Sequence, residues 1–163
     1  WTDIESFVRS TVSGYYEGSY TVYSIILKQG MESFKLDQTF GKKFIQAVES
    51  AITLHLYPSA QAAYLSGNVV HFGCLDVSQE GLCDEKKKAA LPWVEVESVS
   101  IGARVPIYGT YANTLIRERG KKRPWTSIAA GRIKNAEVLR RLIAECVVPV
   151  HGVKLLPRKQ DVG

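Results

Sequence analysis

The sequence predicts a single α+β domain over residues 1–163, with a mainly antiparallel sheet and helices packed on one of its faces. Its 163 residues, of which 45% are hydrophobic and 23% charged, suit one globular domain with its own core. Most apolar segments are short, rich in β-branched and aromatic residues, and bounded by glycine or proline, as strands are. Segments with helical spacing are few and interrupt runs of strands, which favours this class over a doubly wound parallel fold.

The N-terminal segment is predicted to be a helix. Thr2 and Glu5 form a capping-box pattern, in which a hydroxyl and a carboxylate each satisfy a free backbone N–H. Apolar side chains then recur at helical spacing from Ile4 to Val12, and Gly14 suits the end of the helix.

A strand hairpin is predicted next. The segment Ser19–Leu27 is rich in β-branched and aromatic residues and apolar on both faces, as in a central strand. Gln29-Gly30 is a turn signal, so Met31–Leu36 is expected to pair back on this strand.

A second helix is predicted over Phe40–Ser50, with Phe40 and Phe44 at the start of its apolar stripe. The following segment, Ile52–Tyr57, alternates in polarity and is interpreted as a strand that Pro58 ends, although the same residues could continue the helix.

The middle of the chain is predicted to contain strands around one long loop. Val69–Val77 is expected to be a strand, and the charged segment Ser78–Leu91 an exposed, mobile loop with little to bury. Trp93–Ile101 is expected to be a strand whose apolar face changes near Glu97, which indicates a β-bulge.

The last third is predicted to be a strand, a helix and a closing strand. Ala103–Tyr108 is expected to be an edge strand, and Ala136–Cys146 a helix capped by Asn135. Val147–Leu156 is then expected to return as a strand, followed by a frayed tail over 157–163.

The net charge of +5 is unevenly distributed along the chain. Residues 1–103 carry 8 basic and 12 acidic side chains, whereas residues 104–163 carry 13 basic and 4 acidic ones. This asymmetry predicts a polyanionic partner, either nucleic acid or an anionic membrane surface. The alternative is that folding mixes the two halves and dilutes the positive field.

The densest group of cations lies between Arg117 and Trp125, with a glycine and a proline that favour exposure. Cations bind phosphates by releasing counterions, without reading a base, and Trp125 could stack on a base or lie at a membrane interface. The alternative is a solvated loop. The predicted polyanion-binding residues are Arg117, Arg119, Lys121, Lys122, Arg123, Trp125, Arg132, Lys134, Arg140 and Arg141.

Signatures of common enzymes are absent from the sequence, which contains no Walker loop, Rossmann fingerprint, G-x-S-x-G elbow or H-E-x-x-H pair. His71 and Cys74, three residues apart on one predicted strand, would point to opposite faces. No catalytic residue, metal ligand or cofactor is therefore predicted. The rival interpretation is a small hydrolase or transferase with a site assembled from His55, His71, Glu95 and cysteines.

The cysteines and the chain's hydropathy predict an intracellular protein. Cys74, Cys83 and Cys146 match no zinc or redox spacing, so reduced thiols are expected. The first residues lack the layout of a signal peptide, and no apolar run reaches the ~20 residues needed to span a bilayer.

Seven predicted segments follow one another in a characteristic order: Tyr20–Leu36, Phe40–Ser50, Ile52–Val77, Ser78–Leu91, Trp93–Tyr108, Ala136–Cys146 and Val147–Leu156. This order, the size and the basic character resemble the matrix proteins of rhabdoviruses, which condense nucleocapsids beneath a membrane and self-associate. The resemblance implies a homo-oligomeric assembly protein of the host cytoplasm or nucleus, the virion and the inner membrane face. It is one of layout, so it transfers no functional residue, and the basic cluster lies late in this chain rather than near its start.

These observations predict a non-enzymatic viral structural protein of the matrix type, which binds RNA or nucleocapsid and anionic membrane and self-associates during assembly. The alternatives are an RNA-binding accessory protein, such as a silencing suppressor, and the small hydrolase or transferase described above.

Overall fold

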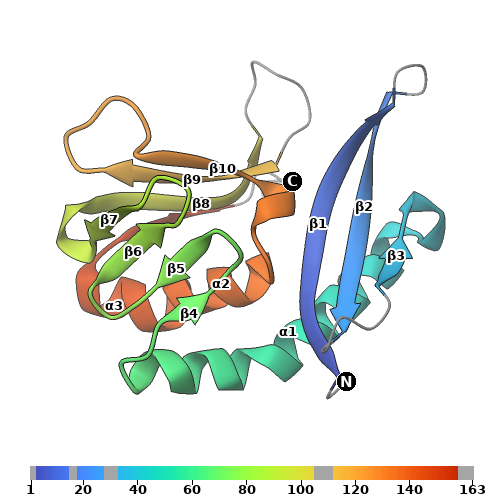
Figure 1. Cartoon of the computed structure of the whole chain (residues 1–163), viewed down its shortest axis with the longest axis horizontal. Helices are drawn as coiled ribbons and strands as arrows, with labels where there is room; N and C mark the ends of the chain where they lie inside the picture. The colour runs from blue at the N-terminus through green and yellow to red at the C-terminus, as the bar shows by residue number, and fades with distance from the viewer. Residues whose placement is uncertain (1–2, 15–17, 28–32, 105–111, 158–163) are drawn as a thin grey trace.

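A computed structural model of the chain describes residues 3–14, 18–27, 33–104 and 112–157 (Figure 1). The described residues form an α+β fold with three β-sheets and a small set of helices, which confirms the predicted fold class. Strand pairing is antiparallel throughout the described residues, except between the last strand, Lys154–Leu156, and the strand Val96–Arg104.

Along the chain, groups of strands alternate with helices. The strands are β1 (Ile4–Gly14), β2 (Gly18–Leu27), β3 (Phe34–Leu36), β4 (Val70–His71), β5 (Leu75–Val77), β6 (Gly81–Asp84), β7 (Ala89–Pro92), β8 (Val96–Arg104), β9 (Ala112–Glu118), β10 (Thr126–Ala129) and β11 (Lys154–Leu156). The helices are α1 (Lys42–Leu65), α2 (Ala136–Leu142) and α3 (Val148–His151), with a π-helical turn at Ile143–Val147 and 3-10 turns at Gln38–Phe40, Trp93–Glu95 and Ala130–Arg132.

The first sheet has the order β1-β2-β3, and its first strand corrects the prediction of an N-terminal helix. The register of β1 against β2 shifts between Ile4 and Ser6. Ile4 and Phe7 are both buried in one small cluster with Ile52 of α1, a spacing that also suits a helix. The expected return of the chain onto β2 is confirmed for Phe34–Leu36, which form β3.

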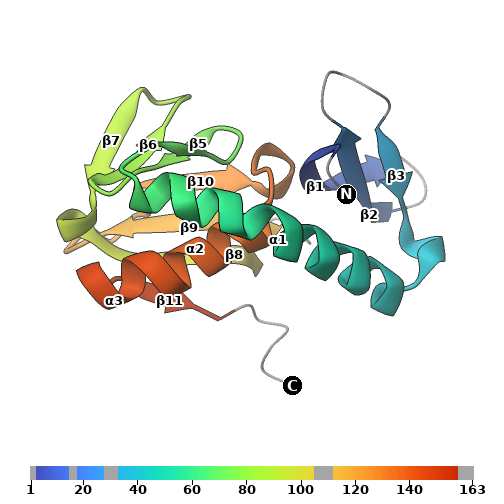
Figure 2. The same ribbon diagram turned by 90° about the horizontal axis from the view of Figure 1, so that it is seen from below.

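Helix α1 crosses the molecule from the first sheet to the β4–β7 sheet (Figure 2). Its 24 residues span about 36 Å at 1.5 Å per residue. The strand predicted over Ile52–Tyr57 is wrong, because the helix continues through this segment and through Pro58. Ile45, Ile52 and Tyr57 face the core, whereas Pro58 is exposed.

The second sheet has the order β4-β5-β6-β7 and corrects the prediction of a long exposed loop at Ser78–Leu91. Strands β6 and β7 pair as a hairpin within this segment. Leu82 and Leu91 are 1% and 3% exposed, so the hairpin contributes to the main core. Within the hairpin, the exposed charged residues, 85–88, lie at its tip.

The third sheet has the order β10-β9-β8-β11, and α2 packs against it (Figure 2). The bulge predicted near Glu97 is confirmed by a register shift between Val96 and Ser98. The strand predicted over Val147–Leu156 is shorter, because Val148–His151 are helical and pairing with β8 begins at Lys154.

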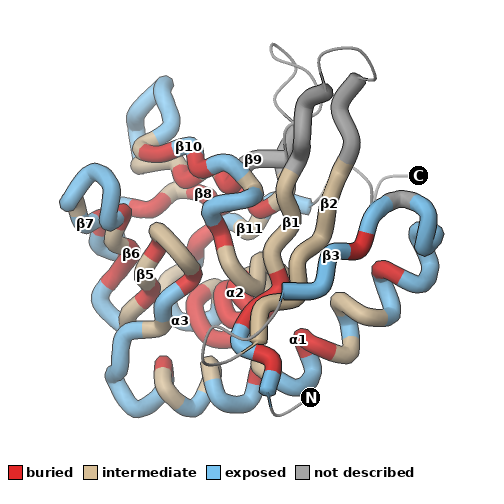
Figure 3. Tube along the Cα trace, turned by 45° about the vertical axis from the view of Figure 1, so that its right-hand side comes forward, coloured by how far each residue is buried: buried red, intermediate tan, exposed pale blue. Residues whose placement is uncertain are grey.

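One hydrophobic core joins the second and third sheets with α1 and α2, and the first sheet adds a smaller cluster on α1 (Figure 3). Trp93 is 1% exposed, and its indole N–H donates to the carbonyl of Ser78 at 2.8 Å. Among the described residues, no helix is both long enough and apolar enough to cross a membrane. The strand predicted at Ala103–Tyr108 is described only to Arg104, and the tail only at Pro157.

Candidate functional site

Two hairpin turns that are distant in the sequence meet at one end of the molecule. The turn between β6 and β7 contains Lys86–Lys88, and the turn between β9 and β10 contains Lys121–Arg123 (Figure 1). The ammonium of Lys87 donates to the carbonyl of Trp125 and lies 5.5 Å from the centroid of the indole ring. We call Lys86–Lys88 and Lys121–Arg123 the paired basic turns.

Asp84, at the end of β6, connects the two turns. Its Oδ1 atom accepts the backbone N–H groups of Lys86 and Lys87 at 3.0 and 3.2 Å, which closes the first turn. Its Oδ2 atom accepts the hydroxyl of Thr126 on β10 at 2.6 Å. Asp84 and Thr126 are each 3% exposed, so the connection is buried.

The charge state of Asp84 supports this connection. Burial raises the pKa of its carboxyl group, but hydrogen bonds from the Thr126 hydroxyl and the N–H groups of Lys87 and Lys86 lower it by more. The net pKa lies below the ordinary value of an aspartate. The carboxylate is therefore ionised at neutral pH, and it accepts hydrogen bonds from the first turn and from the start of β10.

The second turn is held at its base by arginine and backbone contacts. The backbone N–H of Arg119 donates to the carbonyl of Glu95 at 2.8 Å, and its Nε atom donates to the carbonyl of Val94 at 2.9 Å. Arg117 Nη1 donates to the carbonyl of Lys122 at 3.4 Å. These two predicted site residues therefore fix the shape of the turn.

The residues of the paired basic turns are exposed to solvent. All six side chains, from Lys86, Lys87, Lys88, Lys121, Lys122 and Arg123, belong to exposed residues. The acidic residues adjoining these turns in sequence are Asp84, Glu85 and Glu118, of which Asp84 is buried. The surface therefore offers several cations to one ligand from two fixed turns.

Trp125 is partly buried and packs against the main core. Lys87 lies over its ring at 5.5 Å, a cation–π arrangement. Its indole therefore helps to position Lys87 and is also a candidate contact for a ligand.

Arg132 and Lys134 lie apart from the paired basic turns, around a separate hollow of about 400 Å³ between the first sheet and the turn that connects β4 and β5. Cys74 and Glu85 also line this hollow. The ammonium of Lys134 is 3.2 Å from a carboxylate oxygen of Glu5, so this lysine helps to attach β1 to the rest of the fold.

Arg140 and Arg141 lie on α2, away from both the paired basic turns and the hollow at Arg132 and Lys134. Arg141 Nε donates to Glu145 at 2.7 Å, and its guanidinium lies 4.1 Å from the ring centroid of Tyr57. The Tyr57 hydroxyl donates to Glu145 at 2.6 Å, and Arg140 is 3.7 Å from Glu137. Burial, and then the hydrogen bond to Glu145, raise the pKa of Tyr57. This network joins α1 to α2, so the ten predicted residues do not form one surface.

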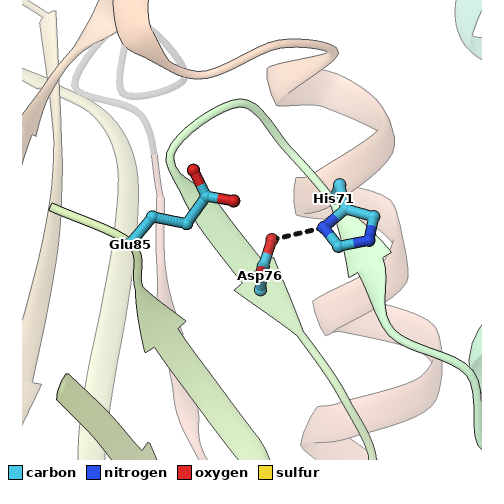
Figure 4. A group of neighbouring side chains, drawn as sticks. All are labelled: His71, Asp76 and Glu85. Carbon is cyan, nitrogen blue, oxygen red and sulfur yellow. Dashed lines mark hydrogen bonds and ion pairs between the residues drawn. The ribbon is translucent and has the colours of Figure 1, made fainter. Parts of the chain in front are cut away.

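One group of side chains has the composition of a metal site (Figure 4). His71, Asp76 and Glu85 offer ligand atoms within 4.8 Å of one another. His71 Nδ1 already lies 2.6 Å from Asp76 Oδ1, and His71 and Glu85 are exposed. An exposed histidine–aspartate pair accounts for this geometry without an ion.

The residues of the rival enzyme interpretation lie on separate elements. His55 is exposed on α1, His71 is on β4 and Glu95 is in a 3-10 turn. Within the described residues, no hydrogen bond or ion pair joins these side chains. His151 stacks on Trp93 with ring centroids 5.9 Å apart.

The three cysteines are free thiols. Burial raises the pKa of Cys74, and the nearby Arg132 guanidinium only partly opposes this effect. A thiol with a raised pKa is a poor nucleophile at neutral pH. His71 and Cys74 were expected on opposite faces of one strand, but only His71 is on a strand, because Cys74 lies in the turn between β4 and β5.

Sequence reasoning missed Asp84, Thr126 and the lysines of the first turn as parts of the site. In an Asx-turn, an aspartate side chain accepts the backbone N–H of a residue two positions later in the chain. Asp84 accepts the N–H groups of Lys86 and Lys87 in this way, so the aspartate before the lysines could have been recognised as a turn signal. Its long-range partner Thr126 leaves no such local signal.

Comparisons with known proteins place the chain in a family. No curated protein and no solved structure matches the chain significantly. One protein family matches residues 1–151, which is most of the chain. The chain therefore belongs to the family described as a family of unknown function, DUF6585.

Proposed function

We propose that this chain is a non-enzymatic protein that binds RNA, as a phosphate-rich polyanion, at the paired basic turns. The observation that carries the proposal is that Asp84 bonds both to the first turn and to Thr126, which follows the second turn. Six exposed cations therefore lie on two connected turns. A site on fixed hairpins loses less conformational entropy on binding than a mobile loop would.

The chemistry of the turns favours a phosphate backbone over a specific base sequence. Lysine ammonium groups are point charges that bind phosphates and release counterions, and they carry little sequence information. Trp125 is covered on one side by Lys87. We therefore expect weak sequence preference and strong dependence on salt.

A matrix-type role, self-association and an intracellular location are wider proposals that extend this one. They stay predictions. RNA binding at the paired basic turns is the part that the geometry supports most directly.

The test compares two double variants that remove the same charge from different ends of the molecule. Lys121→Ala with Lys122→Ala alters the second turn, and Lys42→Ala with Lys43→Ala is the matched control on α1, where both lysines are exposed. Binding of a fluorescent single-stranded RNA is measured by anisotropy over a range of salt concentrations.

We expect the turn variant to bind RNA more weakly and to lower the salt slope by about 0.7 for each lost phosphate contact. The control should keep the slope of the original protein. Equal losses in both variants would show that net charge, rather than the paired basic turns, determines binding.

A further inference from the structure

Three exposed phenylalanines lie close together in the sequence at the end of the molecule opposite the paired basic turns (Figures 1 and 2). Phe34, at the start of β3, is 56% exposed. Phe40, in the 3-10 turn before α1, and Phe44, in the first turn of α1, are each 49% exposed. We call the segment Phe34–Phe44 the aromatic end.

The three phenylalanine rings of the aromatic end are not buried in the core of the protein. Phe40 and Phe44 were expected to begin the apolar stripe of the helix, but Ile45 and Ile52 are the buried residues on this part of α1. The rings of Phe40 and Phe44 instead stack on each other with centroids 5.8 Å apart. Single exposed apolar residues are ordinary, whereas several within one short segment indicate a surface for contact.

Lysines adjoin these phenylalanines in the sequence. Lys35, Lys42 and Lys43 are all exposed. Among the described residues of the aromatic end, the only acidic side chain is Asp37, which accepts the backbone N–H of Thr39 at 2.9 Å and so closes the local turn. The surface therefore combines aromatic rings with a net positive charge.

We propose that the aromatic end docks on the surface of an anionic lipid bilayer. Phenylalanine rings enter the boundary between headgroups and acyl chains, and lysines beside them are attracted to anionic headgroups. A second copy of the chain is a poorer occupant, because two aromatic ends in contact would bring like-charged lysines together.

This site is separate from the paired basic turns and does not depend on the proposed RNA binding. When both sites are occupied, the membrane and the polyanion lie at opposite ends of the long axis of the molecule (Figure 2). The two functions can therefore be lost independently.

The test measures sedimentation of the whole chain with vesicles of phosphatidylcholine alone and with vesicles that also contain phosphatidylserine. Phe40→Ser with Phe44→Ser removes the stacked rings, and Phe34→Ser is a second variant on a different element. The matched control is Leu54→Ser, which removes an apolar side chain that is 66% exposed on the same helix.

We expect the original chain to bind only the vesicles that contain phosphatidylserine. The Phe40/Phe44 variant should lose roughly tenfold or more in partition coefficient, while Leu54→Ser should lose little. Lys42→Ala with Lys43→Ala should lose about fivefold per lysine, and Lys121→Ala with Lys122→Ala should lose little. Phe40→Trp should show a blue shift of tryptophan emission on vesicles, because the indole enters an apolar layer.

Three outcomes would overturn the proposal. One is equal vesicle binding by the original chain, Phe34→Ser and the Phe40/Phe44 variant. Another is loss of vesicle binding only in the Lys121/Lys122 variant, which would place lipid at the paired basic turns. The third is a lipid-free dimer that the Phe40/Phe44 variant converts to a monomer, which would identify a second copy as the occupant. RNA affinity is measured in parallel, so failure of either proposal is recognised separately.

Discussion

The hydrogen bond between Thr126 and Asp84 is expected to stabilise the fold and to position the paired basic turns. Thr126→Val replaces the hydroxyl with a methyl group of similar shape. Asp84 Oδ2 then loses a donor that lies 2.6 Å away, while both side chains, each 3% exposed, remain enclosed. The buried carboxylate is left with one oxygen that no longer receives this hydrogen bond.

The expected cost follows from the charge of the acceptor. Hydrogen bonds to charged groups contribute about 1.5–3 kcal/mol, so the free energy of unfolding should fall by about 2 kcal/mol. With an m-value near 2 kcal/mol/M, the midpoint of urea unfolding should fall by about 1 M. The melting temperature should fall by about 4–8 °C.

The effect should also depend on pH with a definite sign. The pKa of Asp84 is lowered in the folded protein, so its contribution to stability is present above the unfolded value of about 3.9 and is lost as pH falls through the folded pKa. The stability difference between the original protein and Thr126→Val should therefore be full near neutral pH and should shrink below pH ~4.

The matched control is Thr53→Val. Thr53 is 7% exposed, and its hydroxyl donates to the neutral carbonyl of Glu49 within α1 at 2.8 Å. Its loss should cost about 1 kcal/mol or less, with no matching dependence on acidic pH. If Thr126→Val and Thr53→Val were equally stable, or if the deficit of Thr126→Val were the same at acidic and neutral pH, the role assigned to Asp84 would be refuted.

Two further changes test how the parts of the fold are joined. Gly73→Ala should lower the free energy of unfolding by more than about 2 kcal/mol. Its φ is +79°, and an added Cβ would lie 2.2 Å from the carbonyl oxygen of Arg132. The control, Gly67→Ala, should lower this free energy by only about 1 kcal/mol, because φ is similar at +80° but the added Cβ would meet open space. Asn135→Ala removes the side-chain oxygen that accepts the N–H of Phe7 at 2.7 Å, so hydrogen exchange should accelerate in β1 and remain unchanged in β8; equal acceleration in both strands would contradict a local role.

The fold class could be predicted because the spacing of apolar residues matches the secondary structure in most segments. Two segments were ambiguous. Ile4 and Phe7 are both buried, and the register of β1 shifts just after Ile4, so a strand displays the spacing of a helix. Within α1, Ile52 is buried whereas Leu54 is 66% exposed, so the alternation that was interpreted as a strand lies on a helix. Only the tertiary position of that helix shows which apolar residues face the core.

The candidate site could be predicted only where its cations are consecutive. Lys121, Lys122 and Arg123 are recognisable as an exposed basic turn. The contact of Lys87 with Trp125, by contrast, depends on the pairing of β6 with β7 and on the bond from Thr126 to Asp84. The same lysine was assigned to a mobile loop from local charge alone. Long-range contacts of this kind leave no periodic pattern in a sequence.

The parallel pairing of β11 with β8 has a consequence for the order in which the chain folds. Strand β11 supplies the outer edge of the third sheet, yet β8, β9 and β10 all precede it, as do α2 and α3. Closure between Lys154 and Ser98 spans a large loop and is therefore slow relative to the local hairpin of β9 and β10. During synthesis on the ribosome, β8 thus has an open edge that can pair with another nascent chain until Lys154–Leu156 emerge.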